Sequence, residues 1–178
     1  MWSQERYIAA SRFAAAAHAG QTLPDSTLPY LLHVTLVAME VIAALRAEPG
    51  HDEDLAVQCA LLHDTIEDCG VSFAHLEATF GRPVAEGVAA LSRDPALARA
   101  EQIADSLRRI REQPSAVWLV KLADRITNLQ PPPASWQRDK IAAYREEARS
   151  ILAALGEVSP FLAARLAAKI EAYCWGGG

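Results

Sequence analysis

Apolar residues recur three and four positions apart along almost the whole chain, a spacing that is typical of amphipathic helices. No run of alternating apolar and polar residues between turn signals indicates a strand. The pattern predicts an all-α fold, and a length of 178 residues fits a single domain. Helices are expected near residues 3–19, 33–47, 53–68, 72–80, 83–92, 98–112, 115–129, 136–155 and 160–174.

Charge and cysteine content narrow the function classes. The net charge of -5 and the scattered basic residues leave no broad basic face, so we expect no long nucleic acid as partner. Arg6 and Arg12 interrupt the apolar N-terminal residues, and no segment is long and apolar enough for a membrane span. Cys59, Cys69 and Cys174 form no CxxC pair, so we expect neither disulfides nor a thiolate metal site, and a cytoplasmic location.

The segment LLHDTIEDCG at residues 61–70 does not look like ordinary core. On one continuous helix, His63 and Glu67 lie four apart, as do Asp64 and Asp68, so these side chains share an edge. Their like charges repel, and anions at a helix C-terminus cost roughly 0.3–1 kcal/mol each. A bound divalent cation would turn both the charge repulsion and the unfavourable dipole interaction into net attraction. The alternative is a solvated acidic helix end.

Two polar residues that stand alone in apolar helices elsewhere in the chain could provide further ligands for such a cation. His33 opens a helix after a loop, although a lone histidine there is also typical of a core or capping residue. Asp124 lies in VWLVKLADRITNL and shares an edge with Lys121 and Asn128, away from the apolar stripe. The alternative for Asp124 is a surface ion pair with Lys121, which contributes little to stability.

The ordered residues His33, His63-Asp64 and Asp124 resemble the H…HD…D pattern of the HD superfamily of metal-dependent phosphohydrolases. The stretches LLHDTIEDCG, FAHLEATFGRPVAEGVAALSRD and VKLADRITNL resemble the hydrolase domain of RelA/SpoT homologues and the small stand-alone alarmone hydrolases. The resemblance runs from about residue 12 to 129. With the C-terminal helices at 136–174, it implies one HD-type hydrolase domain over residues 1–178.

The resemblance implies that the fold is a compact helical bundle of the HD-domain type. It also implies a reaction and a role for each site residue. The reaction is removal of the 3′-pyrophosphate of (p)ppGpp, a small nucleotide, with Mn²⁺ as the usual ion. The implied metal ligands are His33, His63, Asp64 and Asp124. Glu67 and Asp68 would handle the attacking water, and Asn128 would touch the nucleotide. Two histidines and two carboxylates suit Mn²⁺, though Zn²⁺ or Fe²⁺ would also accept them.

The loop before the first predicted ligand departs from the family pattern. Alarmone hydrolases often carry a basic pair there, whereas residues 20–30 read GQTLPDSTLPY. This departure leaves open another phosphorylated nucleotide, such as (p)ppApp or NADPH. A metal-stabilised nucleotide-binding module without turnover is a further alternative. It does not explain the Glu67-Asp68 pair, because a purely structural ion would not need two extra carboxylates.

A leaving pyrophosphate needs cations, and an aromatic ring can stack on a base. We expect Arg93, Arg108 and Arg109 to contact the phosphates, with Lys121 and Arg125 near Asp124 as further cations. The alternative for each is a solvated surface residue. Aromatic residues that can stack on a base, or simply belong to the core, are Trp118, Trp136 and Tyr144.

Overall fold

The structure, a computed structural model, describes residues 1–132 and 135–173, apart from the side chains of residues 99 and 100. Within these ranges the chain is helical with no strand, so the predicted all-α class is confirmed. Thr22 and Pro29 form an isolated β-bridge. The helices are α1 (Gln4–Ala17), α2 (Leu31–Ala47), α3 (Glu53–Leu62), α4 (Thr65–Cys69), α5 (Phe73–Phe80), α6 (Arg82–Leu91), α7 (Arg99–Arg111), α8 (Ser115–Asn128), α9 (Arg138–Leu155) and α10 (Pro160–Ala172), with a short 3₁₀ turn at Gly156–Val158.

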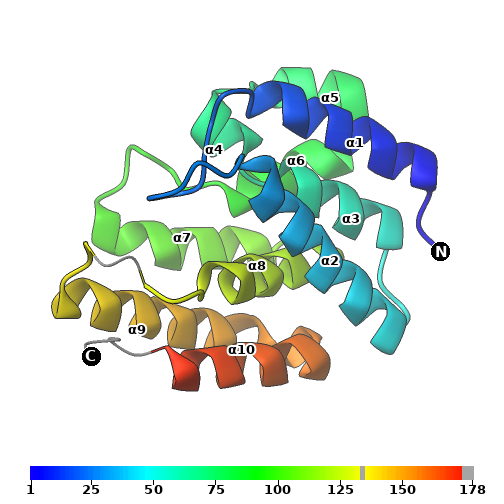
Figure 1. The fold of residues 1–178 in the computed structure, drawn as a ribbon. Coiled ribbons are helices and arrows are strands. Elements are labelled where there is room, and N and C mark those ends of the chain that lie inside the picture. The colour runs from blue at the N-terminus through cyan, green and yellow to red at the C-terminus, as the bar shows by residue number, and fades with distance from the viewer. Residues whose placement is uncertain (133–134, 174–178) are drawn as a thin grey trace.

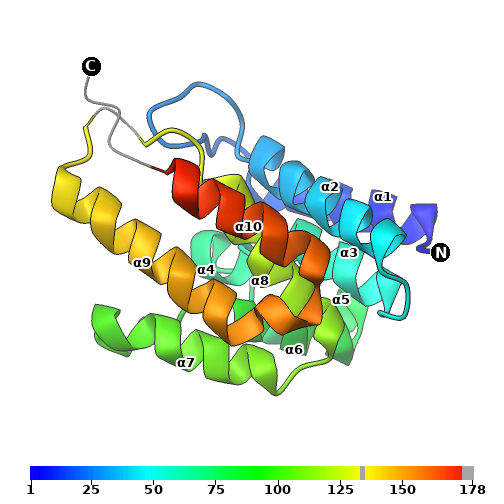
Figure 2. The ribbon, with the colours of Figure 1, turned by 90° about the horizontal axis from the view of Figure 1, so that it is seen from below.

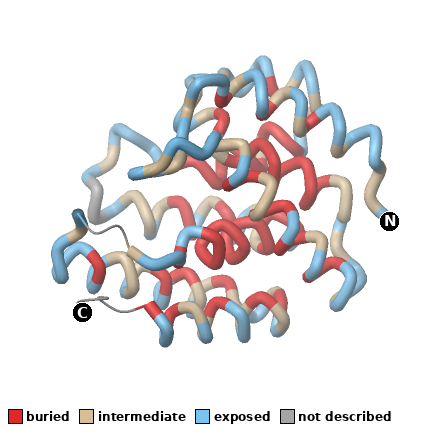
Figure 3. The backbone as a smooth tube through the Cα atoms, in the orientation of Figure 1, coloured by how far each residue is buried: buried red, intermediate tan, exposed pale blue. Residues whose placement is uncertain are grey.

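Helices α3 and α8 form the centre of the bundle. Every residue from Leu55 to Leu62 is buried, and so are nearly all residues of α8 from Ala116 to Thr127. A helix that is apolar on all sides is stable only when it is surrounded by other helices. Helix α2 packs on both of them, α1 covers α3, and α10 covers α8. The buried residues accordingly concentrate in the middle of the molecule (Figure 3).

The outer helices cover the central ones from opposite sides. Helices α1 and α5 lie at one end of the bundle, and α9 and α10 lie at the other (Figure 1). The view from below shows α9 and α10 crossing in front of α8, with α7 beside α9 (Figure 2). Side-chain oxygens cap the N-termini of several helices, and the capping residues are Ser3, Asp52, Ser72 and Ser159.

The single helix predicted over residues 53–68 is wrong, because the chain breaks at His63 and Asp64 into α3 and α4. The Nδ1 of His63 lies 2.9 Å from the carbonyl oxygen of Ala60. The hydroxyl of Thr65 likewise donates to the carbonyl oxygen of Leu62, at 2.7 Å. These side chains compete for the carbonyls that would accept the next helical N–H groups, so the helix ends.

The remaining predicted helices agree with the structure to within a few residues. Gly70 and Gly81 follow α4 and α5 with φ of 67° and 87°, a left-handed backbone region that suits glycine. The predicted end of the last helix at residue 174 lies outside the described residues. None of the helices in the described ranges is long and apolar enough to cross a membrane.

Helices α3, α6 and α8 approach each other closely at Gly87. A Cβ atom at this position would lie 2.7 Å from the Sγ of Cys59 and 3.0 Å from a methyl carbon of Val117. Both neighbours are fully buried and have little room to move. Cys59 therefore belongs to the core, and burial raises the pKa of its thiol to about 12.

Changing Gly87 to Ala should destabilise the protein, although alanine is the better helix former. Overpacking a close-packed core typically costs about 1–3 kcal/mol. Urea unfolding of Gly87→Ala should show this loss, and adding Cys59→Ala should restore part of it because the closest atom is then removed. A Gly87→Ala variant more stable than the native chain would contradict this account of the packing.

Candidate active site

Four side chains from three segments of the fold meet at one buried point. The Nε2 atoms of His33 and His63 lie 3.3 Å apart. An oxygen of Asp64 lies 2.9 Å from Nε2 of His63 and 3.6 Å from that of His33. An oxygen of Asp124 lies 3.4 Å from Nε2 of His33 and 3.8 Å from that of His63. We call these four residues the His–Asp cluster.

The meeting of helices α2, α3 and α8 places this cluster. His33 lies in the first turn of α2, His63 and Asp64 form the break between α3 and α4, and Asp124 lies within α8. Because these three helices pack mutually, the positions converge although they are remote along the chain. The break also turns the backbone at Asp64, so its carboxylate lies beside the imidazole of its own neighbour.

The cluster has the electrostatics of a cation site. Burial acts to raise the pKa of Asp64, but the charge and hydrogen bond of His63, together with the charge of His33, outweigh it and lower that pKa to about 2. Burial also acts to raise the pKa of Asp124, and Lys121 and the two histidines outweigh it and hold that pKa well below its usual range. Two ionised carboxylates therefore face two imidazole nitrogens. His33, His63 and Asp64 have ligand atoms close enough together to hold one metal ion.

Neighbouring groups hold His63 and Asp124 in the orientation that a metal needs. The Nδ1–H of His63 donates to the carbonyl of Ala60, which leaves Nε2 directed at the cluster. Lys121 Nζ lies 3.2 Å from one oxygen of Asp124, and the amide of Asn128 donates to the other at 2.5 Å. Lys121 and Asp124 are each only 7% exposed. The alternative of a surface ion pair is therefore wrong.

Tyr30 is a supporting residue that sequence reasoning missed. Its hydroxyl donates to the Asp64 oxygen that faces the histidines, at 2.6 Å. Burial, followed by the charge of Asp64, raises the pKa of this phenol above its usual range, so it remains a donor. The only signal in the sequence is its position three residues before His33, one turn away on a helix.

Glu67 and Asp68 project from α4 at the exposed edge of the site. One oxygen of Glu67 accepts the backbone N–H of Arg93 at 2.8 Å, and the other lies 3.5 Å from its guanidinium Nε. Among the described residues, Asp68 accepts only a long contact of 3.5 Å from the amide of Gln21. Because α4 has only five residues, both carboxylates lie in its first turn. The first and last turns of so short a helix overlap, so α4 lacks the long-helix dipole that the expected C-terminal penalty assumed.

The predicted phosphate-binding arginines occupy different places. Arg93 lies beside Glu67 of α4. Arg109 instead donates to the carbonyls of Ala89, Ala90 and Ser92, which fastens α7 to the end of α6. Arg108 is exposed and pairs with Asp105 of its own helix and with Glu112, the residue that follows it. None of the hydrogen bonds or ion pairs found among the described residues joins Arg108 or Arg109 to the cluster.

A cleft of about 250 Å³ opens beside the cluster, and His33 and Asn128 form part of its wall. Aromatic rings line it: Trp136 meets Tyr144 edge to face, with centroids 5.3 Å apart, and Tyr173 lies next to Tyr144. Two of these rings were predicted as possible stacking partners, and Tyr173 was missed. Trp118 lies elsewhere and donates its indole N–H to the carbonyl of Gln113.

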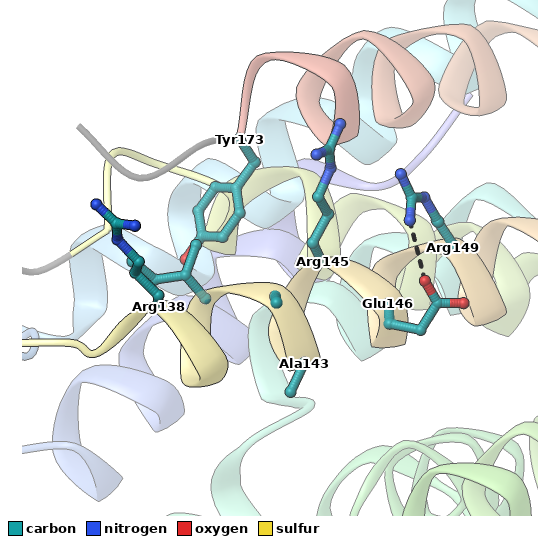
Figure 4. A pocket seen from close by; sticks show the side chains of 8 residues that line it. Arg138, Ala143, Arg145, Glu146, Arg149 and Tyr173 are labelled. Carbon is teal, nitrogen blue, oxygen red and sulfur yellow. Dashed lines mark hydrogen bonds and ion pairs between the residues drawn. The ribbon is translucent and has the colours of Figure 1, made fainter. Parts of the chain in front are cut away.

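A separate, more open groove of about 790 Å³ runs along α9 (Figure 4). Arg149 pairs with Glu146 on its rim at 3.0 Å, and Arg145 donates to the carbonyl of Ile170. Tyr173 lines both this groove and the aromatic cleft. None of the residues predicted for metal binding, catalysis or substrate binding lines the groove, so we place the active site at the cluster.

A family profile described as HD domain matches residues 10–159. The chain therefore belongs to the HD domain family.

Its relatives within that family are nucleotide hydrolases by name. Guanosine-3′,5′-bis(diphosphate) 3′-pyrophosphohydrolase MESH1 of Danio rerio is 33% identical over 149 residues, 80% of each chain. The guanosine-3′,5′-bis(diphosphate) 3′-pyrophosphohydrolase of Vibrio cholerae is 39% identical over 123 residues, 66% of this chain and 16% of the relative. A solved structure titled as a metazoan orthologue of SpoT that hydrolyses ppGpp has the same fold, with a TM-score of 0.83, 24% identity and coverage of 98% and 99% of the two chains.

Removing the buried partner of Asp124 should destabilise the metal-free protein. Lys121→Met deletes the charge while keeping most of the side-chain volume, and breaking a buried ion pair from one side costs about 3–5 kcal/mol. The matched control is Arg149→Met, which breaks an exposed pair and should cost less than about 1 kcal/mol. Equal losses in urea unfolding would show that Lys121 contributes no more than a surface charge.

Proposed function

We propose that this protein is a metal-dependent phosphohydrolase that removes the 3′-pyrophosphate of (p)ppGpp. The observation that carries the proposal is the His–Asp cluster, which lies between the acidic residues of α4 and an aromatic cleft. The named activity of the zebrafish relative, which aligns with most of this chain, supports the same reaction. A small nucleotide is thus the proposed substrate.

The four residues of the cluster would hold the ion. Their mixed nitrogen and oxygen donors suit Mn²⁺, with Zn²⁺ or Fe²⁺ as alternatives. The buried carboxylates need a positive charge among them, and a divalent cation fits that need. When bound, such an ion supplies Lewis acidity and makes a coordinated water more acidic.

Glu67 and Asp68 are proposed to share the handling of the attacking water. Arg93 holds Glu67 through its backbone N–H, so the Glu67 carboxylate is fixed and suited to orient the water. Asp68 has only one long contact and keeps an oxygen available to accept a proton. A positioned general base contributes roughly a hundredfold to ten-thousandfold to the rate.

The cleft beside His33 is proposed to hold the purine. Tyr144, Tyr173 and Trp136 offer ring faces or edges, and the exposed amide of Asn128 lies at the wall between cleft and cluster. The guanidinium of Arg93 would meet the phosphates on the other side. A phosphate role for Arg108 and Arg109 stays a prediction that would require them to leave their present partners.

A second nucleotide is favoured by one observation. Leu23 and Pro24 line the cleft from the loop in which alarmone hydrolases often carry a basic pair. An apolar loop attracts a terminal 5′-diphosphate less, which favours NADPH as the second candidate. (p)ppApp carries the same phosphates as (p)ppGpp and is the alternative that differs only in its base. The remaining alternative is a nucleotide-binding module without turnover, and the paired carboxylates of α4 speak against it.

Turnover by the Mn²⁺-loaded protein should be measured on a panel of ppGpp, ppApp and NADPH. We expect ppGpp to give GDP and pyrophosphate, and a chelator to abolish the reaction. Preferred hydrolysis of NADPH would support the second candidate instead, and preferred hydrolysis of ppApp would support the alternative base. Binding of all three without product would identify a binding module.

The acidic pair should be needed for turnover but not for the metal. The double variant Glu67→Gln, Asp68→Asn should lose at least about a hundredfold in kcat while Mn²⁺ binding is kept. Glu101→Gln, an exposed acid on α7, serves as the control and should retain full activity. Retained activity in the double variant would rule out the proposed roles.

A further inference from the structure

Residues outside the cluster form a continuous chain of contacts that ends on one metal ligand. Tyr30 donates to Asp64, and the Tyr30 ring stacks on His18 with centroids 4.8 Å apart and planes 30° apart. His18 is 4% exposed and lies at the C-terminal end of α1. The contacts thus connect α1 to the cluster through a single phenol ring.

Gln21 fixes both members of the stack. Its backbone carbonyl accepts the N–H of Tyr30 at 2.9 Å, and its side-chain oxygen lies 2.7 Å from Nδ1 of His18. The Sγ of Cys69 lies 3.1 Å from the same nitrogen. The imidazole of His18 is therefore held on its edge as well as on its face, and it offers Tyr30 a fixed surface.

The Asp64 oxygen that accepts from Tyr30 is also the one nearest to both histidines. A carboxylate oxygen has two lone pairs, so one can accept the phenol while the other faces the centre of the cluster. Without the phenol, rotation of the Asp64 carboxylate would be restrained only by the imidazoles. Partners of this kind typically change metal affinity by about 10–100-fold.

We propose that Tyr30 and His18 are positioning residues for the metal: Tyr30 orients Asp64, and His18 acts through Tyr30 by holding its ring. Neither residue was assigned a role by the sequence motifs. The inference rests on the metal site of the proposed function but not on the identity of the substrate.

The test is a titration of the metal-free protein with MnCl₂ by isothermal calorimetry, without nucleotide. Tyr30→Phe keeps the ring and its stack but removes the donor, so the Kd for Mn²⁺ should rise about 10–100-fold. The melting temperature of the metal-free variant should stay close to that of the native chain. The matched control is Tyr7→Phe on α1, where the ring packs on Trp2 and Mn²⁺ binding should not change.

A double-mutant cycle tests whether His18 acts through Tyr30. His18→Ala should weaken Mn²⁺ binding in the native chain but by less than about twofold in the Tyr30→Phe background. His18→Phe, which keeps an aromatic face against Tyr30, should restore most of the affinity. At saturating Mn²⁺, all these variants should keep the native KM for the nucleotide.

The outcomes separate this inference from the proposed function. Native affinity in Tyr30→Phe would overturn the role of Tyr30, and additive effects in the cycle would overturn the role of His18. If the native protein binds no Mn²⁺, the metal site itself is rejected and this inference falls with it. If it binds Mn²⁺ and Tyr30→Phe weakens binding but no nucleotide is hydrolysed, the inference stands and the proposed function fails.

Discussion

Two carboxylates face two imidazoles at the junction of α2, α3 and α8, and the rest of the structure is arranged around that contact. Buried like charges are unfavourable unless a cation or hydrogen-bond donors compensate them. Here Lys121 and Asn128 compensate Asp124, while Tyr30 and His63 compensate Asp64. The compensation leaves one oxygen of each carboxylate close to the histidine nitrogens, where a divalent ion has the donors it needs.

The scaffold makes this arrangement possible because its central helices are rigid. Helices α3 and α8 are buried along nearly their whole length, so their positions are fixed by packing on every side. The close approach at Gly87 shows how little space remains between them and α6. A site built from such elements holds its ligands in place before any ion binds, which favours tight and selective binding.

The break at His63 and Asp64 both ends α3 and positions side chains of the His–Asp cluster. Side-chain hydrogen bonds from His63 and Thr65 end α3, and the same imidazole then presents its other nitrogen to the cluster. Helix α4 restarts at once and carries Glu67 and Asp68 along the edge of the site. Two of the proposed metal ligands and the acidic pair thus come from a short stretch of chain, while α2 and α8 supply the remaining proposed ligands. The aromatic rings of the cleft come from Tyr144 of α9 and from Trp136 and Tyr173, which flank α9 and α10.

The sequence by itself determined the helical class and most helix boundaries, and with the family resemblance it singled out the residues of the cluster as candidates. Helical periodicity follows from which residues are apolar, and His33, His63, Asp64 and Asp124 were visible as polar residues in apolar surroundings. Spacing on an assumed continuous helix, however, misplaced Glu67 and Asp68, because side-chain hydrogen bonds that no propensity describes break that helix.

Only the tertiary structure decided which distant residues support the site. Tyr30 and His18 contact each other through a loop and the end of α1, and Tyr173 reaches the cleft from beyond α10. Lys121 resembles a surface lysine in the sequence, yet the packing of α8 buries it against Asp124. Arg109 was expected at the phosphates and instead binds backbone carbonyls of α6. Such contacts depend on how helices pack in three dimensions, and the order of residues along the chain does not show that packing.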